Sequence, residues 1–87
     1  MAFKMANLEN CFNQAQVKGA AFVGVKIEMG GFPEPEVIIN GRENIESKLE
    51  YYKKTYNENL EHNHAPGIKI VAFTYGENFT DIQEDLA

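Results

Sequence analysis

Residues 20–29 read Ala-Ala-Phe-Val-Gly-Val-Lys-Ile-Glu-Met, and hydrophobic side chains recur at every second position of this stretch. In an extended chain, one face would carry Val23, Val25, Ile27 and Met29. A period of two, rich in β-branched residues, predicts a β-strand over 20–29. Gly24 within this strand predicts a bulge or a close approach by a covering element.

The turn residues Gly30-Gly31-Phe32-Pro33 follow directly, and residues 36–40 alternate again. Val37 and Ile39 fall on one face of this second strand and Ile38 on the other. Two strands joined by a short glycine-containing loop predict an antiparallel hairpin. Because Pro35 cannot donate to a strand ladder, the second strand is expected at an edge of the sheet.

The strongest helical pattern covers residues 42–60. Apolar residues recur there at spacings of three and four, at Ile45, Leu49, Tyr52, Tyr56 and Leu60. Asn40, followed three residues later by Glu43, resembles a capping-box start. The helix is expected to end before Pro66.

Weaker patterns complete the chain. An amphipathic helix is predicted over 6–18, capped by Asn7 and closed by Gly19, and a third strand over 68–75. Thr80, with Gln83 three residues later, predicts a short C-terminal helix that docks through Ile82 and Leu86.

The predicted order is therefore helix, strand, strand, helix, strand, short helix within one domain, 1–87. Because a helix joins the second and third strands, these are expected to run parallel, with the first strand inserted between them. The prediction is a two-layer α+β sandwich with a three-stranded mixed/antiparallel sheet of order 2-1-3.

The two faces of this sheet differ in predicted role. The aliphatic face is expected to pack on the long helix and comprises Val23, Val25, Ile27, Val37, Ile39, Ile68 and Ile70. The other face carries a second apolar and aromatic set, Phe22, Ile38, Val71, Phe73 and Tyr75. Such a face is too apolar to be left fully in water, so the N-terminal helix, the C-terminal tail or a partner is expected to cover it.

Composition narrows the function classes. The 87 residues carry a net charge of −5, and the second sheet face has few lysines, which disfavours direct binding of nucleic acid. No apolar run reaches the roughly 18–20 residues needed to cross a bilayer, so no membrane partner is expected. The lone Cys11 favours an intracellular, cytoplasmic protein over a secreted one.

Catalytic and cofactor chemistry finds little support in the sequence. His62 and His64 would need a third ligand to hold a metal, and no neighbouring cluster supplies one. Cys11 lies on an apolar stripe, where packing is the expected role. The glycines form no phosphate-binding motif, so we expect no enzyme, no cofactor and no metal site.

Three functions remain open. The first is a non-enzymatic interaction module that forms homodimers, or binds a protein partner, through the face of Phe22, Ile38, Val71, Phe73 and Tyr75. The second is an inhibitor or decoy that offers a basic partner, such as a nucleic-acid-handling protein, the acidic residues Glu34, Glu36, Glu77, Asp81, Glu84 and Asp85. The third binds a small ligand between the sheet and the long helix, near Tyr52 and Tyr56. The small, acidic composition resembles that of accessory proteins of bacteria and phages.

Overall fold

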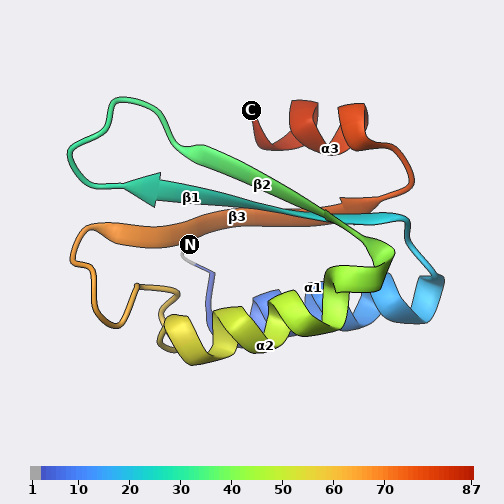
Figure 1. Cartoon of the computed structure of the whole chain (residues 1–87), viewed down its shortest axis with the longest axis horizontal. Coiled ribbons are helices and arrows are strands. Elements are labelled where there is room, and N and C mark those ends of the chain that lie inside the picture. Colours follow the sequence, from blue (N-terminus) through green and yellow to red (C-terminus); the bar gives the residue numbers. More distant parts are fainter. Residues whose placement is uncertain (1–2) are drawn as a thin grey trace.

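The computed structural model describes residues 3–87 (Figure 1). The elements along the chain are α1 (Met5–Lys18), β1 (Phe22–Met29), β2 (Glu36–Gly41), the 3-10 turn η1 (Arg42–Asn44), α2 (Ile45–Thr55), β3 (Ile68–Gly76) and α3 (Phe79–Leu86). The predicted order of helices and strands is confirmed.

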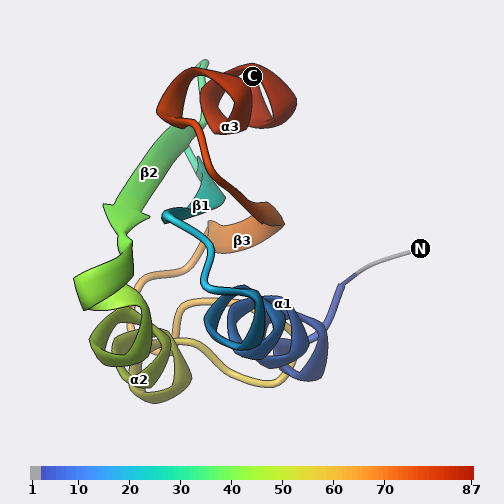
Figure 2. The same ribbon diagram turned by 90° about the vertical axis from the view of Figure 1, so that its right-hand side faces the viewer.

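The three strands form one sheet with the order β2-β1-β3, and both outer strands are antiparallel to β1. The predicted α+β class, the strand order and the edge position of β2 are confirmed. Helices α1 and α2 lie side by side on one face of the sheet, and α3 lies on the opposite face (Figure 2). We call these the two-helix face and the α3 face.

The N-terminal helix begins slightly earlier than predicted. Lys4 is its N-cap, and Asn7 stands in the first turn, where its Oδ1 accepts a hydrogen bond from the Lys4 N–H at 2.8 Å. Asn7 therefore supports the helix start from inside the helix, and its prediction as the cap is wrong. Gly19 closes the helix in the left-handed conformation, with φ 66°, as predicted.

The second helix is shorter than the predicted 42–60. It begins at Ile45 after η1, and Asn40 lies in β2, so no capping box forms with Glu43. It ends at Thr55 because Tyr56 is extended and Asn57 Oδ1 accepts hydrogen bonds from the N–H groups of Asn59 and Glu61. Such a side-chain turn competes with continued helix.

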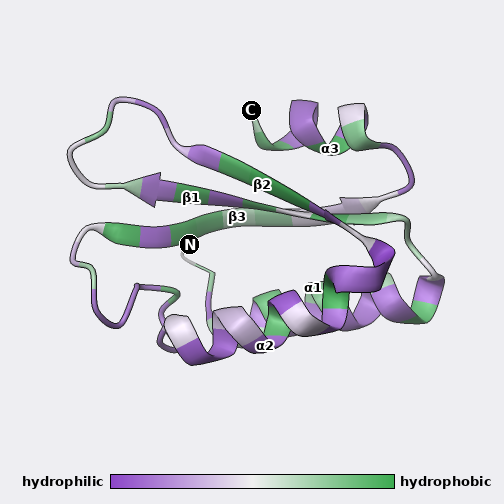
Figure 3. Cartoon of the chain, in the orientation of Figure 1, coloured by the Kyte–Doolittle hydropathy of each residue, from purple (hydrophilic) through white to green (hydrophobic). Residues whose placement is uncertain are grey.

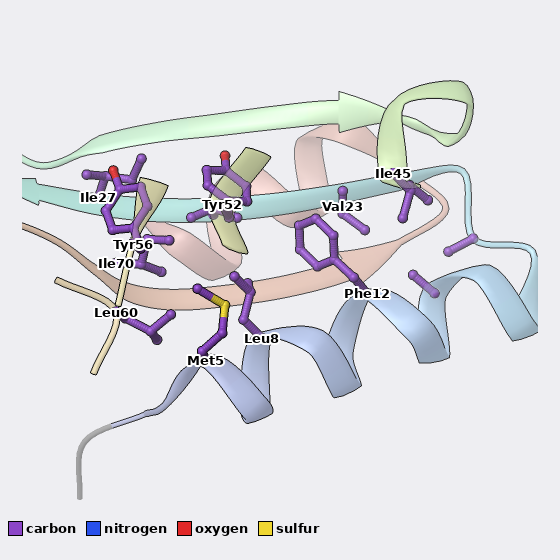
Figure 4. Close-up of a cluster of buried hydrophobic side chains, with 13 residues drawn as sticks. Met5, Leu8, Phe12, Val23, Ile27, Ile45, Tyr52, Tyr56, Leu60 and Ile70 are labelled. Carbon is purple, nitrogen blue, oxygen red and sulfur yellow. The ribbon is translucent and has the colours of Figure 1, made fainter. Parts of the chain in front are cut away.

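The main hydrophobic core lies between the sheet and the two helices beneath it (Figure 4). Its buried residues include Leu8, Phe12, Val23, Val25, Ile27, Ile45, Tyr52, Leu60 and Ile70. Leu60 reaches this core from the loop after α2, with φ 64°. In Figure 3, hydrophobic residues predominate along the strands, whereas most residues of α2 are coloured as hydrophilic. The periodicity thus identified buried residues correctly even where the helix had already ended.

The Cα radius of gyration is 12.3 Å. A folded domain of this length is expected to have about 12 Å, so the chain is compact. Across the part of the chain that the structure describes, no helix combines the length and the apolar character required to traverse a lipid bilayer.

Candidate functional site

The predicted apolar face does not exist as one surface. Val25 is paired with Ile38 on one side and with Phe73 on the other, and Val23 is paired with Tyr75. Directly paired residues share a face of a sheet. Ile38, Phe73 and Tyr75 therefore belong to the two-helix face, where they pack against the core.

A β-bulge explains why Phe73 and Tyr75 of β3 were predicted on the wrong face of the sheet. Lys26 is paired with Ala72 and Ile27 with Ile70, so Val71 has no partner on β1. An extra residue reverses the alternation beyond it. The even-numbered Ile70 and the odd-numbered Phe73 consequently share the two-helix face, which strict alternation excludes.

The faces of β2 were also predicted the wrong way round, for another reason. Alternation separates Ile38 from its neighbours but does not say which side faces the core. The hairpin register sets Gly24 opposite Ile39 and Lys26 opposite Val37. Ile39 and Val37 therefore lie on the α3 face, and their predicted packing on the long helix is wrong.

Helix α3 covers part of the second face, so the C-terminal tail is the one of the three expected covers that the structure places there. Ile82 and Leu86 are buried, and a methyl group added at Gly24 would collide with both side chains. Phe22 completes this contact against Phe79, with ring centroids 6.0 Å apart. The predicted close approach at Gly24 is confirmed. The cap of α3 is Asn78, whose Oδ1 accepts from the Thr80 N–H at 2.8 Å, so the prediction of Thr80 as cap is wrong.

The outer edge of β3 is only half paired. The N–H of His62 donates to the Ile68 carbonyl at 2.8 Å, and the N–H of Ile70 donates to the Leu60 carbonyl at 2.9 Å. Beyond the bulge, no strand of the described chain pairs with the outer edge of residues 72–76. An unpaired edge is a template for another strand.

A groove of about 500 Å³ runs between this open edge and α1. We call it the edge groove; it is lined by Phe3, Asn7, Asn10, Cys11, Gln14, Lys18, Phe73, Thr74 and Tyr75. Phe3, 48% exposed, packs on Phe73 with ring centroids 4.9 Å apart. The Nζ of Lys18 lies 5.7 Å from the centre of the Tyr75 ring.

The edge groove is poor in charge. Lys18 is its single charged lining residue, whereas 24% of the chain is charged. Depletion of charge with enrichment of aromatic residues characterises the centre of protein interfaces. The α1 side of this groove was not predicted, although the run of uncharged Asn and Gln side chains on the polar face of that helix was a signal for it.

A second cavity, of about 230 Å³, lies between α2 and the sheet, beside the predicted pair Tyr52 and Tyr56. We call it the tyrosine cavity; it is lined by Ile27, Met29, Glu36, Ile38, Lys48, Tyr51, Tyr52, Tyr56, His62 and Ile68. The structure thus places a cavity where the sequence predicted a small-ligand pocket. Two charged residues, Lys48 and Glu36, also line this cavity, and the sequence did not predict them as pocket residues.

Tyr52 is the most constrained group of this cavity. The residue is 1% exposed, and its hydroxyl has no hydrogen-bond partner within the described chain. A buried hydroxyl left without a partner costs about 1–3 kcal/mol. Burial is the main cause that raises the pKa of Tyr52, with smaller contributions from Tyr56, Tyr51 and Glu36. Burial likewise raises the pKa of Tyr56.

The two histidines are engaged in local packing. The His62 ring meets the Tyr56 ring with centroids 5.2 Å apart, and His62 Nδ1 accepts from the His64 N–H at 3.0 Å. Within residues 3–87, no three His, Cys, Asp or Glu side chains gather in a metal-binding arrangement. A further hollow of about 520 Å³ beside His62 is lined mostly by the exposed loop of residues 57–67.

Cys11 lies beside the edge groove and is partly buried. Burial raises the pKa of its thiol to about 11, so the reactive thiolate is scarce near neutral pH. The geometry gives Cys11 the packing role expected from the sequence.

The predicted acidic residues do not converge. Glu36 begins β2 opposite Ile27, whereas Glu77 follows β3 at the other end of the sheet, where it accepts from the Ala21 N–H at 3.1 Å. Glu34 lies in the hairpin loop, and Asp81, Glu84 and Asp85 lie exposed on α3. The six carboxylates thus come from the hairpin loop, the start of β2, the turn after β3 and the exposed side of α3.

No protein-family model, no curated protein and no solved structure is significantly similar to this chain.

Proposed function

We propose that this chain is a non-enzymatic interaction module that self-associates through the open edge of β3 and the edge groove beside it. The observation that supports this is the coincidence of an unpaired strand edge with an aromatic, charge-poor groove. Strand addition to an open edge is a recurrent mode of protein recognition.

The two edges of the sheet differ in how they are protected. Pro35 and Glu36 stand at the entry to β2, and proline and charge both discourage pairing at an edge. Residues 72–75 of β3 are Ala, Phe, Thr and Tyr, without charge or proline. The β3 edge is therefore the better template for an added strand.

A second copy suits this edge for electrostatic reasons. Two chains of charge −5 repel each other, so a stable contact must keep their carboxylates apart. The edge groove has no carboxylate in its lining. A groove that is nearly neutral faces a copy of itself without a cluster of like charges.

A two-fold axis would make the contact self-complementary. With the axis near Thr74, antiparallel pairing of the two β3 edges would set Phe73 of one copy opposite Tyr75 of the other. Aromatic cross-strand pairs of this kind add roughly 0.2–1 kcal/mol each. The product would be one continuous six-stranded sheet with the two α1 helices adjacent.

Sedimentation equilibrium over a range of concentrations tests this proposal. Asn10→Glu with Gln14→Glu places two negative charges in the edge groove, at exposed positions of α1. The matched control, Asn13→Glu with Gln16→Glu, makes the same changes at exposed positions of the same helix outside the groove. We expect a dimer for the wild type and the control, and a monomer for the groove variant.

A monomeric wild type would contradict the proposal. So would equal association of the groove variant and its control, because the contact would then lie elsewhere. Circular dichroism of both variants checks that the helix remains intact; glutamate is a good helix former, so the substitutions are expected to be tolerated.

A further inference from the structure

The tyrosine cavity lies apart from the edge groove, and its lining combines an apolar body with one unused polar group. Aliphatic side chains of the sheet form one wall and the rings of Tyr51, Tyr52 and Tyr56 form another. Figure 4 shows the hydroxyl oxygens of Tyr52 and Tyr56 on the side of their rings that faces β2. Small-molecule sites typically pair apolar walls with a few placed polar groups.

The unpaired hydroxyl of Tyr52 indicates that a ligand of this cavity would carry a group able to form a hydrogen bond. It is buried, lies on a ring that lines the cavity, and has no partner among residues 3–87. A phenolic hydroxyl both donates and accepts, so a single ligand hydroxyl satisfies it. An apolar ligand of the same shape would leave it unsatisfied.

The charges around the cavity favour a neutral ligand. The Nζ of Lys48 lies 4.8 Å from the centre of the Tyr51 ring and 5.1 Å from that of Tyr52, so a cation already occupies the aromatic faces. Glu36 supplies the opposite charge, close enough to influence the titration of Tyr52. A charged ligand of either sign would be repelled by one lining residue, a cation by Lys48 and an anion by Glu36, whereas a neutral ligand meets neither repulsion.

The size of the cavity limits the ligand. A volume of about 230 Å³ corresponds to roughly seven or eight water molecules, at about 30 Å³ for each molecule in the liquid. The tyrosine and histidine rings line it at tilted angles, with centroids 5.2 to 5.9 Å apart along the series Tyr51, Tyr52, Tyr56 and His62. This spacing suits edge or offset contacts with one further ring.

We propose that the tyrosine cavity binds a small, neutral, aromatic molecule with one hydroxyl group, which exchanges a hydrogen bond with the Tyr52 hydroxyl. Phenol has this size and chemistry and serves as the probe. The site is separate from the edge groove and does not depend on self-association.

Methyl-resolved NMR titration with phenol and with toluene tests the proposal. Toluene keeps the ring and the size but lacks the hydroxyl. We expect saturable shifts at the methyl groups of Ile27, Met29 and Ile38, and about two- to tenfold tighter binding of phenol than of toluene, the range of one net hydrogen bond. Benzoate, an anion of similar shape, is expected to bind more weakly than phenol.

The matched variants are Tyr52→Phe and Ser47→Ala, which each remove one hydroxyl oxygen, the first inside the cavity and the second at an exposed position of the same helix. Tyr52→Phe keeps the packed ring and is expected to remove the preference for phenol over toluene, while Ser47→Ala keeps it. Equal affinity of the wild type for the two probes would overturn the proposal. Shifts that map elsewhere, no saturable shift with phenol, or tighter binding of benzoate than of phenol would overturn it as well.

Discussion

The two faces of the sheet are covered in different ways. The two-helix face buries side chains from α1, β1, α2, β3 and the loop after α2, including Phe12, Tyr52 and Leu60. The α3 face is covered in part by one eight-residue helix with two buried side chains, Ile82 and Leu86. Burial of apolar area is the main source of stability, so the first face carries most of the folding free energy. The stability of the second face depends on the close packing of Ile82 and Leu86 against Gly24.

The sharpest test of this contrast is to empty the larger core. Phe12 is fully buried and meets the Tyr52 ring edge-on, with centroids 6.1 Å apart. Phe12→Ala is expected to lower the free energy of unfolding by about 3–5 kcal/mol, measured by urea denaturation. Phe79→Ala, at a 48% exposed ring on the α3 face, is the control and should cost about 1 kcal/mol or less. Equal losses would contradict the contrast.

The fit of α3 can be broken from the sheet side. Gly24→Ala places a methyl group against Ile82 and Leu86 and is expected to cost about 1–3 kcal/mol by overpacking. Hydrogen exchange should show α3 losing protection while the sheet remains protected. Ile82→Ala removes the obstructing methyl, so it should cost less in the Gly24→Ala background than alone. Additive costs would show that the two residues do not touch.

The start of α3 offers a smaller test. Asn78→Ala removes the side-chain oxygen that accepts from Thr80 and Asp81, and is expected to cost about 1 kcal/mol in thermal or urea unfolding. Asn78→Asp keeps an acceptor and should retain most of the stability. An alanine variant as stable as the wild type would show that the cap is dispensable.

Alkaline pH should weaken the packing of the two-helix face. The pKa of Tyr52, and that of Cys11 at about 11, are raised in the folded protein, so folding favours their protonated forms. This stability is complete below the unfolded pKa values, roughly 8.5 for Cys and 10 for Tyr, and is lost as pH rises through the folded values. Unfolding free energies measured from pH 8 to 11 should fall.

Tyr52→Phe with Cys11→Ala is the matched variant for this pH series. Its stability should fall less steeply than that of the wild type, because two of the three groups whose pKa burial raises are gone and only Tyr56 remains. Parallel pH profiles would contradict the assignment.

Periodicity identified much of the fold in advance. The alternation of Val23, Val25 and Ile27 placed β1, and the spacing of Ile45, Leu49 and Tyr52 placed α2, because these patterns repeat the geometry of their own elements. Gly24 predicted either a bulge or a close covering element, and the structure shows the second. The end of α2 was less accessible, since the side-chain turn at Asn57 competes with a helical pattern that continues to Leu60.

The candidate sites were only partly predictable. Tyr52 and Tyr56 directed attention to the right cavity, but Lys48 and Glu36 join it from elements whose relative placement no local pattern records. The edge groove needed Phe3 and Phe73 to meet, 70 positions apart in the chain. Local propensity has no access to such contacts.

By itself, the sequence determined which segments are helices and strands, which residues are apolar at regular spacing, and the strand order that a short hairpin and a helical crossover impose. Only the tertiary structure decided which face of β2, and which face of β3 beyond its bulge, meets the helices. Alternation is symmetric between the two faces, so the hairpin register at Val25 and the bulge at Val71 had to break that symmetry. Both are products of hydrogen bonding between strands, which no single strand encodes.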